Sequence, residues 1–75
     1  MSYAKLRGRI REIYGTQEAF AKAIGLSKVA LSMRLNNKTD WSSREMVKAK
    51  EALKIKDSEI IAYFFTPSVQ NSELN

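Results

Sequence analysis

The chain contains neither cysteine nor histidine, and this constrains its fold and chemistry more than any other feature of the sequence. Without thiols, neither a disulfide nor a thiolate metal site can stabilise a chain of only 75 residues, so its core must do so alone. Without histidine, the commonest general base and metal ligand is missing too. Three glycines and one proline leave little room for a turn-rich β fold. The sequence therefore predicts an all-α domain with no metal, no cofactor and no enzymatic activity.

Positive charge is concentrated in the first half of the chain. Residues 1–38 carry eight basic and two acidic side chains, a balance of +6, whereas residues 39–75 carry five and six, a balance of −1. Such an excess favours an anionic partner such as nucleic acid, although a solvated basic face is the alternative. No apolar run is long enough to span a bilayer and the first residues do not resemble a signal peptide. We therefore expect a cytoplasmic protein with no membrane contact and no small-molecule substrate.

Hydrophobic spacing and capping residues predict five helices. They cover Tyr3–Tyr14 after a Ser2 cap, Gln17–Ile24 after a Thr16 cap, the segment from a Ser27 cap to Leu35, the segment after a Ser42–Glu45 capping box, and Ser58–Phe65. A strand is the alternative for residues 60–65, because short apolar runs are ambiguous. Residues 1–67 are assigned to one domain and residues 68–75 to a flexible tail.

Two further expectations concern packing. Gly8 costs about 1 kcal/mol relative to alanine inside a helix, so we expect it to mark a close approach of another element. On the first helix, Ile13 continues the inward apolar stripe, and on the second helix Ala23 faces inward.

The second and third predicted helices form a helix-turn-helix. Two helices that cross over a short turn need a small residue where they touch, and Ala21 meets this need. The turn also needs a residue that tolerates a positive φ, and Gly25 meets that need.

This segment resembles the helix-turn-helix of lambdoid phage repressors and Cro proteins. The residues that carry the resemblance are Thr16-Gln17-Glu18, Phe20-Ala21, Ile24-Gly25 and Asn36-Asn37-Lys38. From Leu6 to Thr66 the chain is also similar to the short repressor-like proteins of Gram-positive bacteria and their prophages. The resemblance implies a five-helix lambda-repressor-like DNA-binding domain. Arg34 departs from it, because the family usually has an apolar residue there; either the stem packs while the head reaches solvent, or the third helix is rotated.

The third helix, residues 27–35, is the expected recognition helix in the major groove of DNA. At about 100° per residue, three side chains lie away from the core side of this helix, and Lys28 lies on the border, where its long side chain can swing outward. These candidate base-reading residues are Lys28, Val29, Ser32 and Met33. Apolar groups suit thymine methyls and a lysine can reach guanine. The alternative is that Val29 and Met33 pack elsewhere in the domain.

A second set of residues is expected to hold DNA phosphates. Gln17 and Ser27 lie at helix starts, where amides and the helix dipole favour anions. The resemblance adds a backbone contact for Gln17 and contacts from the loop after the third helix. The predicted phosphate-binding residues are Arg9, Thr16, Gln17, Ser27, Asn36, Asn37 and Lys38. The alternatives are that Gln17 only caps its helix and that Arg9 and Lys38 are solvated surface charges.

The fifth predicted helix is apolar on every side, which is more than one small core can cover. We expect Ile60 and Phe64 to face the core and Ile61 and Phe65 to form a dimer interface. The alternative is that the segment 67–74 covers this patch and the protein stays monomeric.

Together these features predict a homodimeric, sequence-specific regulator of transcription that binds double-stranded DNA. The alternative function, from a different class, is a modulator that uses the same fold to bind a phage repressor protein. An enzyme is the remote third interpretation, because no carboxylate pair or glycine-rich phosphate loop is evident.

Overall fold

The computed structural model describes residues 3–65. Its helices are α1 (Ala4–Tyr14), α2 (Gln17–Ala23), α3 (Lys28–Leu35), α4 (Ser43–Ala52) and α5 (Ile60–Phe64), the last preceded by the 3-10 turn η1 (Asp57–Glu59). Within this region there is no strand, so the predicted all-α fold with a helix-turn-helix at the second and third helices is confirmed. Residues 60–65 are not a strand. The predicted tail and the boundary at residue 67 lie outside the described residues.

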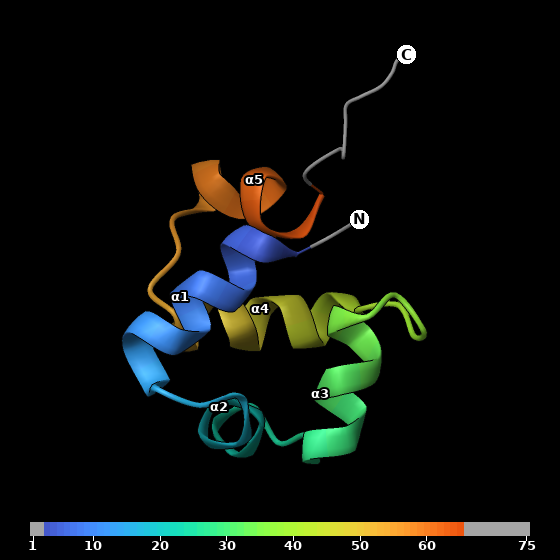
Figure 1. Ribbon diagram of the computed structural model, residues 1–75. Helices are drawn as coiled ribbons and strands as arrows, with labels where there is room; N and C mark the ends of the chain where they lie inside the picture. Colours follow the sequence, from blue (N-terminus) through green and yellow to red (C-terminus); the bar gives the residue numbers. More distant parts are fainter. Residues whose placement is uncertain (1–2, 66–75) are drawn as a thin grey trace.

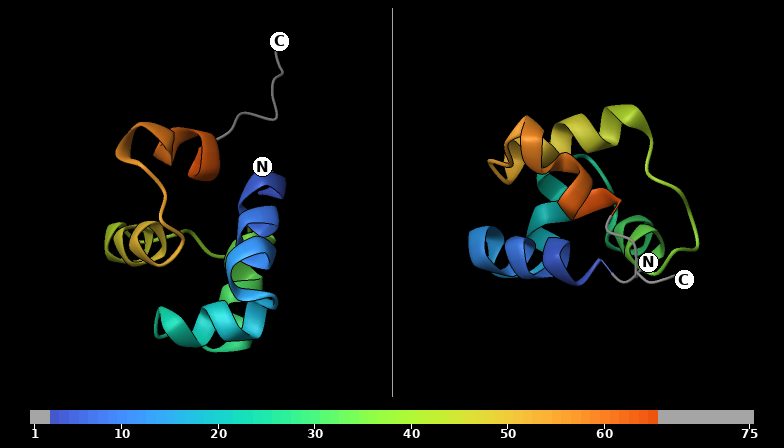
Figure 2. Two further views of the ribbon diagram at one scale, coloured as in Figure 1. Left: turned by 90° about the vertical axis from the view of Figure 1, so that its left-hand side faces the viewer. Right: turned by 90° about the horizontal axis from the view of Figure 1, so that it is seen from above.

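The helices pack around a single core. Figure 1 shows α2 and α3 at one end of the molecule and α5 at the other end, beside α1. In the side view of Figure 2, α4 is seen nearly end-on beside α1, with α5 above and α2 below. No helix within residues 3–65 has both the length and the apolar character needed to cross a bilayer.

Polar caps define where three of the helices begin. The hydroxyls of Thr16 and Ser27 each accept a backbone N–H from the first turn of their helices, at 3.1 and 3.0 Å. At the start of α4, the Ser42 hydroxyl accepts the Glu45 N–H at 3.1 Å, and the Glu45 carboxylate accepts the Ser42 N–H at 3.0 Å. These hydrogen bonds confirm the predicted caps. Each cap satisfies N–H groups that have no partner inside the helix.

The first helix differs from its predicted form at two points. It begins at Ala4, and its N-cap is Tyr3, whose φ of 54° lies in the left-handed region, rather than Ser2. A Cβ placed on Gly8 would meet no atom within 4 Å, so the expected close approach at this exposed glycine is wrong. The predicted end at Gly15 is confirmed, with φ 82°.

The core draws on α1 to α5 and on the segments that join them. Its buried hydrophobic residues are Leu6, Ile10, Phe20, Ala21, Ile24, Leu31, Leu35, Trp41, Ala49, Leu53, Ile55 and Phe64.

Two residues expected inside are exposed. Ile13 is 39% exposed, because the inward stripe of α1 continues at i+4 spacing from Leu6 and Ile10 to Tyr14, whose ring lies 5.5 Å from that of Phe20. Ala23 ends α2 and is exposed.

The turn of the helix-turn-helix follows the predicted design. Ala21 is 1% exposed, and its carbonyl accepts the Leu26 N–H at 2.8 Å, which joins the end of α2 to the turn. Gly25 has a φ of 78°, in the region that L side chains rarely adopt. After this turn α3 runs in a different direction from α2, and the apolar side of α3, with Leu31 and Leu35, lies on the core.

Candidate interaction surface on α3

The outer side of α3 presents apolar side chains to solvent. Leu31 and Leu35 are buried in the core, whereas Val29 is 68% and Met33 42% exposed. Lys28 is exposed and Ser32 half-buried on the neighbouring side. Val29 and Met33 are therefore not part of the core of the described domain, and the alternative that they pack inside it is wrong. We call Lys28, Val29, Ser32 and Met33 the α3 face.

An ion pair fixes α3 to α4. The Arg34 guanidinium contacts both oxygens of the Glu45 carboxylate, with Nε–Oε1 and Nη2–Oε2 distances of 2.8 Å, and its Nη1 donates to the Ala30 carbonyl at 2.8 Å. The same carboxylate caps α4 through the Ser42 N–H. The hydrogen bonds from Arg34 lower the pKa of Glu45, and those to Glu45 raise the pKa of Arg34.

This ion pair corrects both expectations for Arg34. The guanidinium does not extend into solvent, since its side chain is only 15% exposed. The helix is not rotated either, because Leu31 and Leu35 still face the core.

A second arginine fixes the C-terminal end of α3 to α1. Arg7 Nη2 donates to the Leu35 carbonyl at 2.8 Å and to Asn36 Oδ1 at 3.2 Å, and the Asn36 amide donates to the Ser32 carbonyl at 2.8 Å. A cation at the end of a helix satisfies its last carbonyls and complements its dipole. Arg7 is absent from the predicted site, because its contact joins residues 28 positions apart and no local sequence pattern indicates it. Asn36, a predicted phosphate contact, is used here within the protein.

Arg9 lies at the end of α4 rather than beside α3. Its Nε donates to the Leu53 carbonyl at 2.9 Å, and its Nη1 pairs with Glu12 at 3.1 Å. The Tyr14 hydroxyl donates to the adjacent Ala52 carbonyl at 3.4 Å. Arg9 thus connects α1 to α4, and its phosphate contact stays a prediction.

The remaining predicted phosphate contacts surround α3. The Thr16 and Ser27 hydroxyls are used as caps. Asn37 has a φ of 62°, and Lys38 is exposed, with its N–H donating to the Met33 carbonyl at 2.8 Å. Their contacts with DNA stay predictions.

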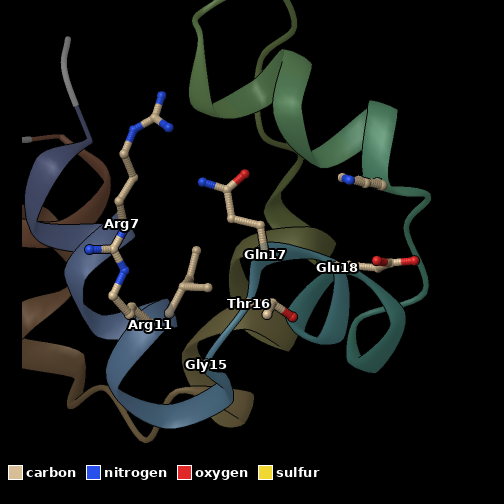
Figure 3. A pocket seen from close by; sticks show the side chains of 8 residues that line it. Arg7, Arg11, Gly15, Thr16, Gln17 and Glu18 are labelled. Carbon is tan, nitrogen blue, oxygen red and sulfur yellow. The ribbon is translucent and has the colours of Figure 1, made fainter.

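A hollow of about 450 Å³ opens between α1, the start of α2 and the start of α3. We call it the basic hollow; it is lined by Arg7, Ile10, Arg11, Gly15, Thr16, Gln17, Glu18 and Lys28. Figure 3 shows Arg7 and Arg11 extending from α1, with the Gln17 carboxamide between them and α3. Thr16, Gln17 and Lys28 come together here, whereas Arg9 and the loop residues 36–38 do not line it. No sequence pattern predicts this juxtaposition, because it brings together residues from three helices.

The predicted self-association residues lie on α5 (Ile61) and at its C-cap (Phe65), and α5 lies at the other end of the molecule from α2 (Figure 1). Ile61 is 69% and Phe65 48% exposed, whereas Phe64 is 2% exposed and Ile60 half-buried. The Phe64 ring lies edge-on to Trp41 at 5.2 Å. The predicted core-facing pair is thus confirmed, and Ile61 and Phe65 are on the surface.

These features define a small all-helical protein with a helix-turn-helix whose α3 face is solvent-accessible. The chain belongs to the family described as proteins of unknown function (DUF739), which it matches over residues 1–67. It is similar to the solution structure of the modulator of repression (MOR) of the temperate bacteriophage TP901-1 from Lactococcus lactis. The two chains are 42% identical, with a TM-score of 0.77 over 85% of this chain and 86% of that one. No curated protein matches the chain.

This relationship corrects the predicted family. The helix-turn-helix residues resemble those of lambdoid repressors and Cro proteins, but the family is DUF739, and the relative modulates repression rather than being a repressor. The error has a physical reason: caps, the turn glycine and the small contact residue specify the fold, and one fold serves several functions.

Proposed function

We propose that this chain is a phage modulator of repression that binds a repressor protein and performs no catalysis. The observation that carries this proposal is its 42% identity over 85% of its length to MOR of phage TP901-1. The basic charge of residues 1–38 and the exposed α3 face are compatible with a protein partner as well as with DNA. We further propose that it acts in the cytoplasm of the host.

The α3 face supports this function in two ways. Val29 and Met33 offer apolar groups that can enter a groove on a protein, and methionine adapts its shape to irregular surfaces. In addition, α3 is fixed to two other helices: the Arg34–Glu45 ion pair joins it to α4, and the bond from Arg7 to the Leu35 carbonyl joins its end to α1. A helix that is already fixed loses less conformational freedom on binding, which favours affinity.

Binding to double-stranded DNA is the second candidate function, favoured by the +6 balance of residues 1–38. The α3 face would then read bases, and the predicted phosphate-binding residues would hold the backbone. Dimerisation through Ile61 and Phe65 would bring two α3 helices to one DNA site. The 42% identity to MOR of phage TP901-1 favours the protein partner over this function.

The experiment is a binding titration of the intact chain against two partners. One is a phage repressor, either that of TP901-1 or the one encoded with this chain; the other is duplex DNA in low and moderate salt. The modulator function predicts saturable binding to a repressor and a changed affinity of that repressor for its operator. Binding to DNA alone, with a steep dependence on salt, would replace it by the second function.

A further inference from the structure

Basic side chains outnumber acidic ones in the lining of the basic hollow. Arg7, Arg11 and Lys28 line it against a single carboxylate, that of Glu18. Arg11 and Lys28 are exposed, and neither forms an ion pair with any residue in the described range 3–65. Arg7 is held in place by its bonds at the end of α3. The charges of Arg11 and Lys28 are therefore not neutralised by any residue in the part of the chain that the structure describes.

Gln17 adds an orienting group at the centre of the hollow. It is half-buried, and its carboxamide makes no hydrogen bond with another residue among those described. Figure 3 places this carboxamide between the α1 arginines and α3. A carboxamide offers both donors and an acceptor. The hollow thus combines positive charge with a partly desolvated hydrogen-bonding group, as an anion site requires.

We infer that the basic hollow receives an acidic side chain, or a short acidic segment, of the repressor that the α3 face binds. This inference rests on the proposed function and adds the chemistry of the partner. Arginine forms paired hydrogen bonds with a carboxylate, and Arg11 presents a guanidinium that has no partner among the described residues. Lys28 adds a second positive charge on the α3 side.

The position of the hollow favours a carboxylate on a protein over a DNA phosphate. Lys28 lines the hollow, and the next residue on α3 is Val29, which is 68% exposed. A complementary partner would therefore present an acidic group beside an apolar one. A protein surface can present one isolated acidic side chain beside an apolar one, whereas the phosphates that accompany thymine methyls in DNA form a continuous run of charge. The Glu18 carboxylate, which also lines the hollow, would repel a run of phosphates more than a single acidic side chain.

The experiment uses charge reversal in the hollow with matched controls outside it. Arg11→Glu and Lys28→Glu are compared with Arg44→Glu and Lys48→Glu, which make the same charge reversals at exposed positions on α4. Affinity for the repressor is measured by calorimetry, and folding is checked by thermal unfolding. We expect Arg11→Glu and Lys28→Glu to weaken binding about tenfold or more and the controls to change it less than about twofold. Glu→Lys or Asp→Lys variants of the repressor should include one that restores binding to Arg11→Glu.

The outcomes separate this inference from the proposed function. If the wild-type chain binds the repressor and the hollow variants bind it equally well, the basic hollow is not the contact, while the modulator function stands. If the wild-type chain binds no repressor, both are overturned. If the hollow variants keep repressor binding but lose binding to duplex DNA, the anion is a phosphate and the inference is wrong.

Discussion

The Arg34 guanidinium of α3 and the Glu45 carboxylate of α4 form a two-pronged ion pair, with both N–O distances at 2.8 Å and side chains only 15% and 18% exposed. Glu45 simultaneously accepts the Ser42 N–H that begins α4. One carboxylate thus both starts a helix and fixes the angle at which α3 presents its outer face. Partly buried, charge-assisted hydrogen bonds of this kind are among the stronger polar contacts in a protein.

Breaking this pair should destabilise the domain measurably. We expect Glu45→Gln and Arg34→Met each to lower the free energy of unfolding by about 1–3 kcal/mol, because the remaining partner loses a charged hydrogen bond in a poorly solvated position. Urea unfolding of both single variants and the double variant isolates the coupling between the two side chains. The exposed Arg44→Met serves as the control and should change stability by less than about 0.5 kcal/mol. Additive single effects would show that the pair contributes nothing of its own.

The same pair should make stability depend on pH in the acidic range. The hydrogen bonds from Arg34 lower the pKa of Glu45 in the folded state, so the unfolded chain binds a proton more readily than the folded one. The contribution of Glu45 is therefore fully present above its ordinary pKa of about 4.3 and is lost as the pH falls through the lowered value. Unfolding midpoints of wild type and Glu45→Gln should converge as the pH is lowered from 7 to 3. A constant difference across this range would contradict the prediction.

Two glycine substitutions should have opposite effects. Gly8→Ala adds a methyl group where no atom lies within 4 Å, inside an α-helix, so it should raise the free energy of unfolding by about 0.5–1 kcal/mol. Gly25→Ala places a side chain at φ 78° and should lower it by about 1–2 kcal/mol. Thermal unfolding of the two variants beside wild type measures both effects. A destabilising Gly8→Ala would mean that α1 packs more closely there than the structure shows.

Local chemistry explains which features could be predicted from the sequence. The caps at Thr16, Ser27 and Ser42 and the turn at Gly25 depend on residues a few positions apart, so their spacing alone indicates them. The Arg34–Glu45 pair and the Arg7 contact with Leu35 join residues 11 and 28 positions apart. No local pattern indicates such pairs, because a long flexible side chain can reach several neighbours and the fold decides which one. The basic hollow was missed for the same reason: it requires three helices to meet.

The identity of the partner could not be predicted from the exposed side chains of the third helix. Val29 and Met33 were correctly placed on the outside of the third helix by helical geometry, and the structure leaves them 68% and 42% exposed. Geometry cannot say whether an exposed apolar side chain meets thymine methyls or a protein groove, because both are apolar surfaces. The 42% identity to MOR of phage TP901-1, rather than the physics of the exposed face, is what favours a modulator over a repressor.

Polar substitution of the α3 face should weaken repressor binding without unfolding the domain. We expect Val29→Ser together with Met33→Ser to reduce affinity about tenfold or more, since the apolar area buried at the interface contributes about 25 cal/mol per Å². Val47→Ser is the matched control, because Val47 is 52% exposed on α4. Calorimetric titration of the repressor with each variant measures the effect. Equal losses for Val47→Ser and the α3 variant would place the contact elsewhere.

Self-association through α5 is the last prediction. Ile61 and Phe65 are 69% and 48% exposed, lie four residues apart at the end of the molecule away from α2, and form an apolar pair of the kind that marks interfaces (Figure 1). We expect the wild-type chain to sediment as a dimer at tens of micromolar and Phe65→Glu to sediment as a folded monomer, because a charge cannot be buried there without a partner. Val47→Glu, which adds the same charge to an exposed apolar position on α4, should leave the dimer intact. If the wild-type chain sediments as a monomer at this concentration, α5 does not mediate self-association. A single chain would then be the form that binds the repressor.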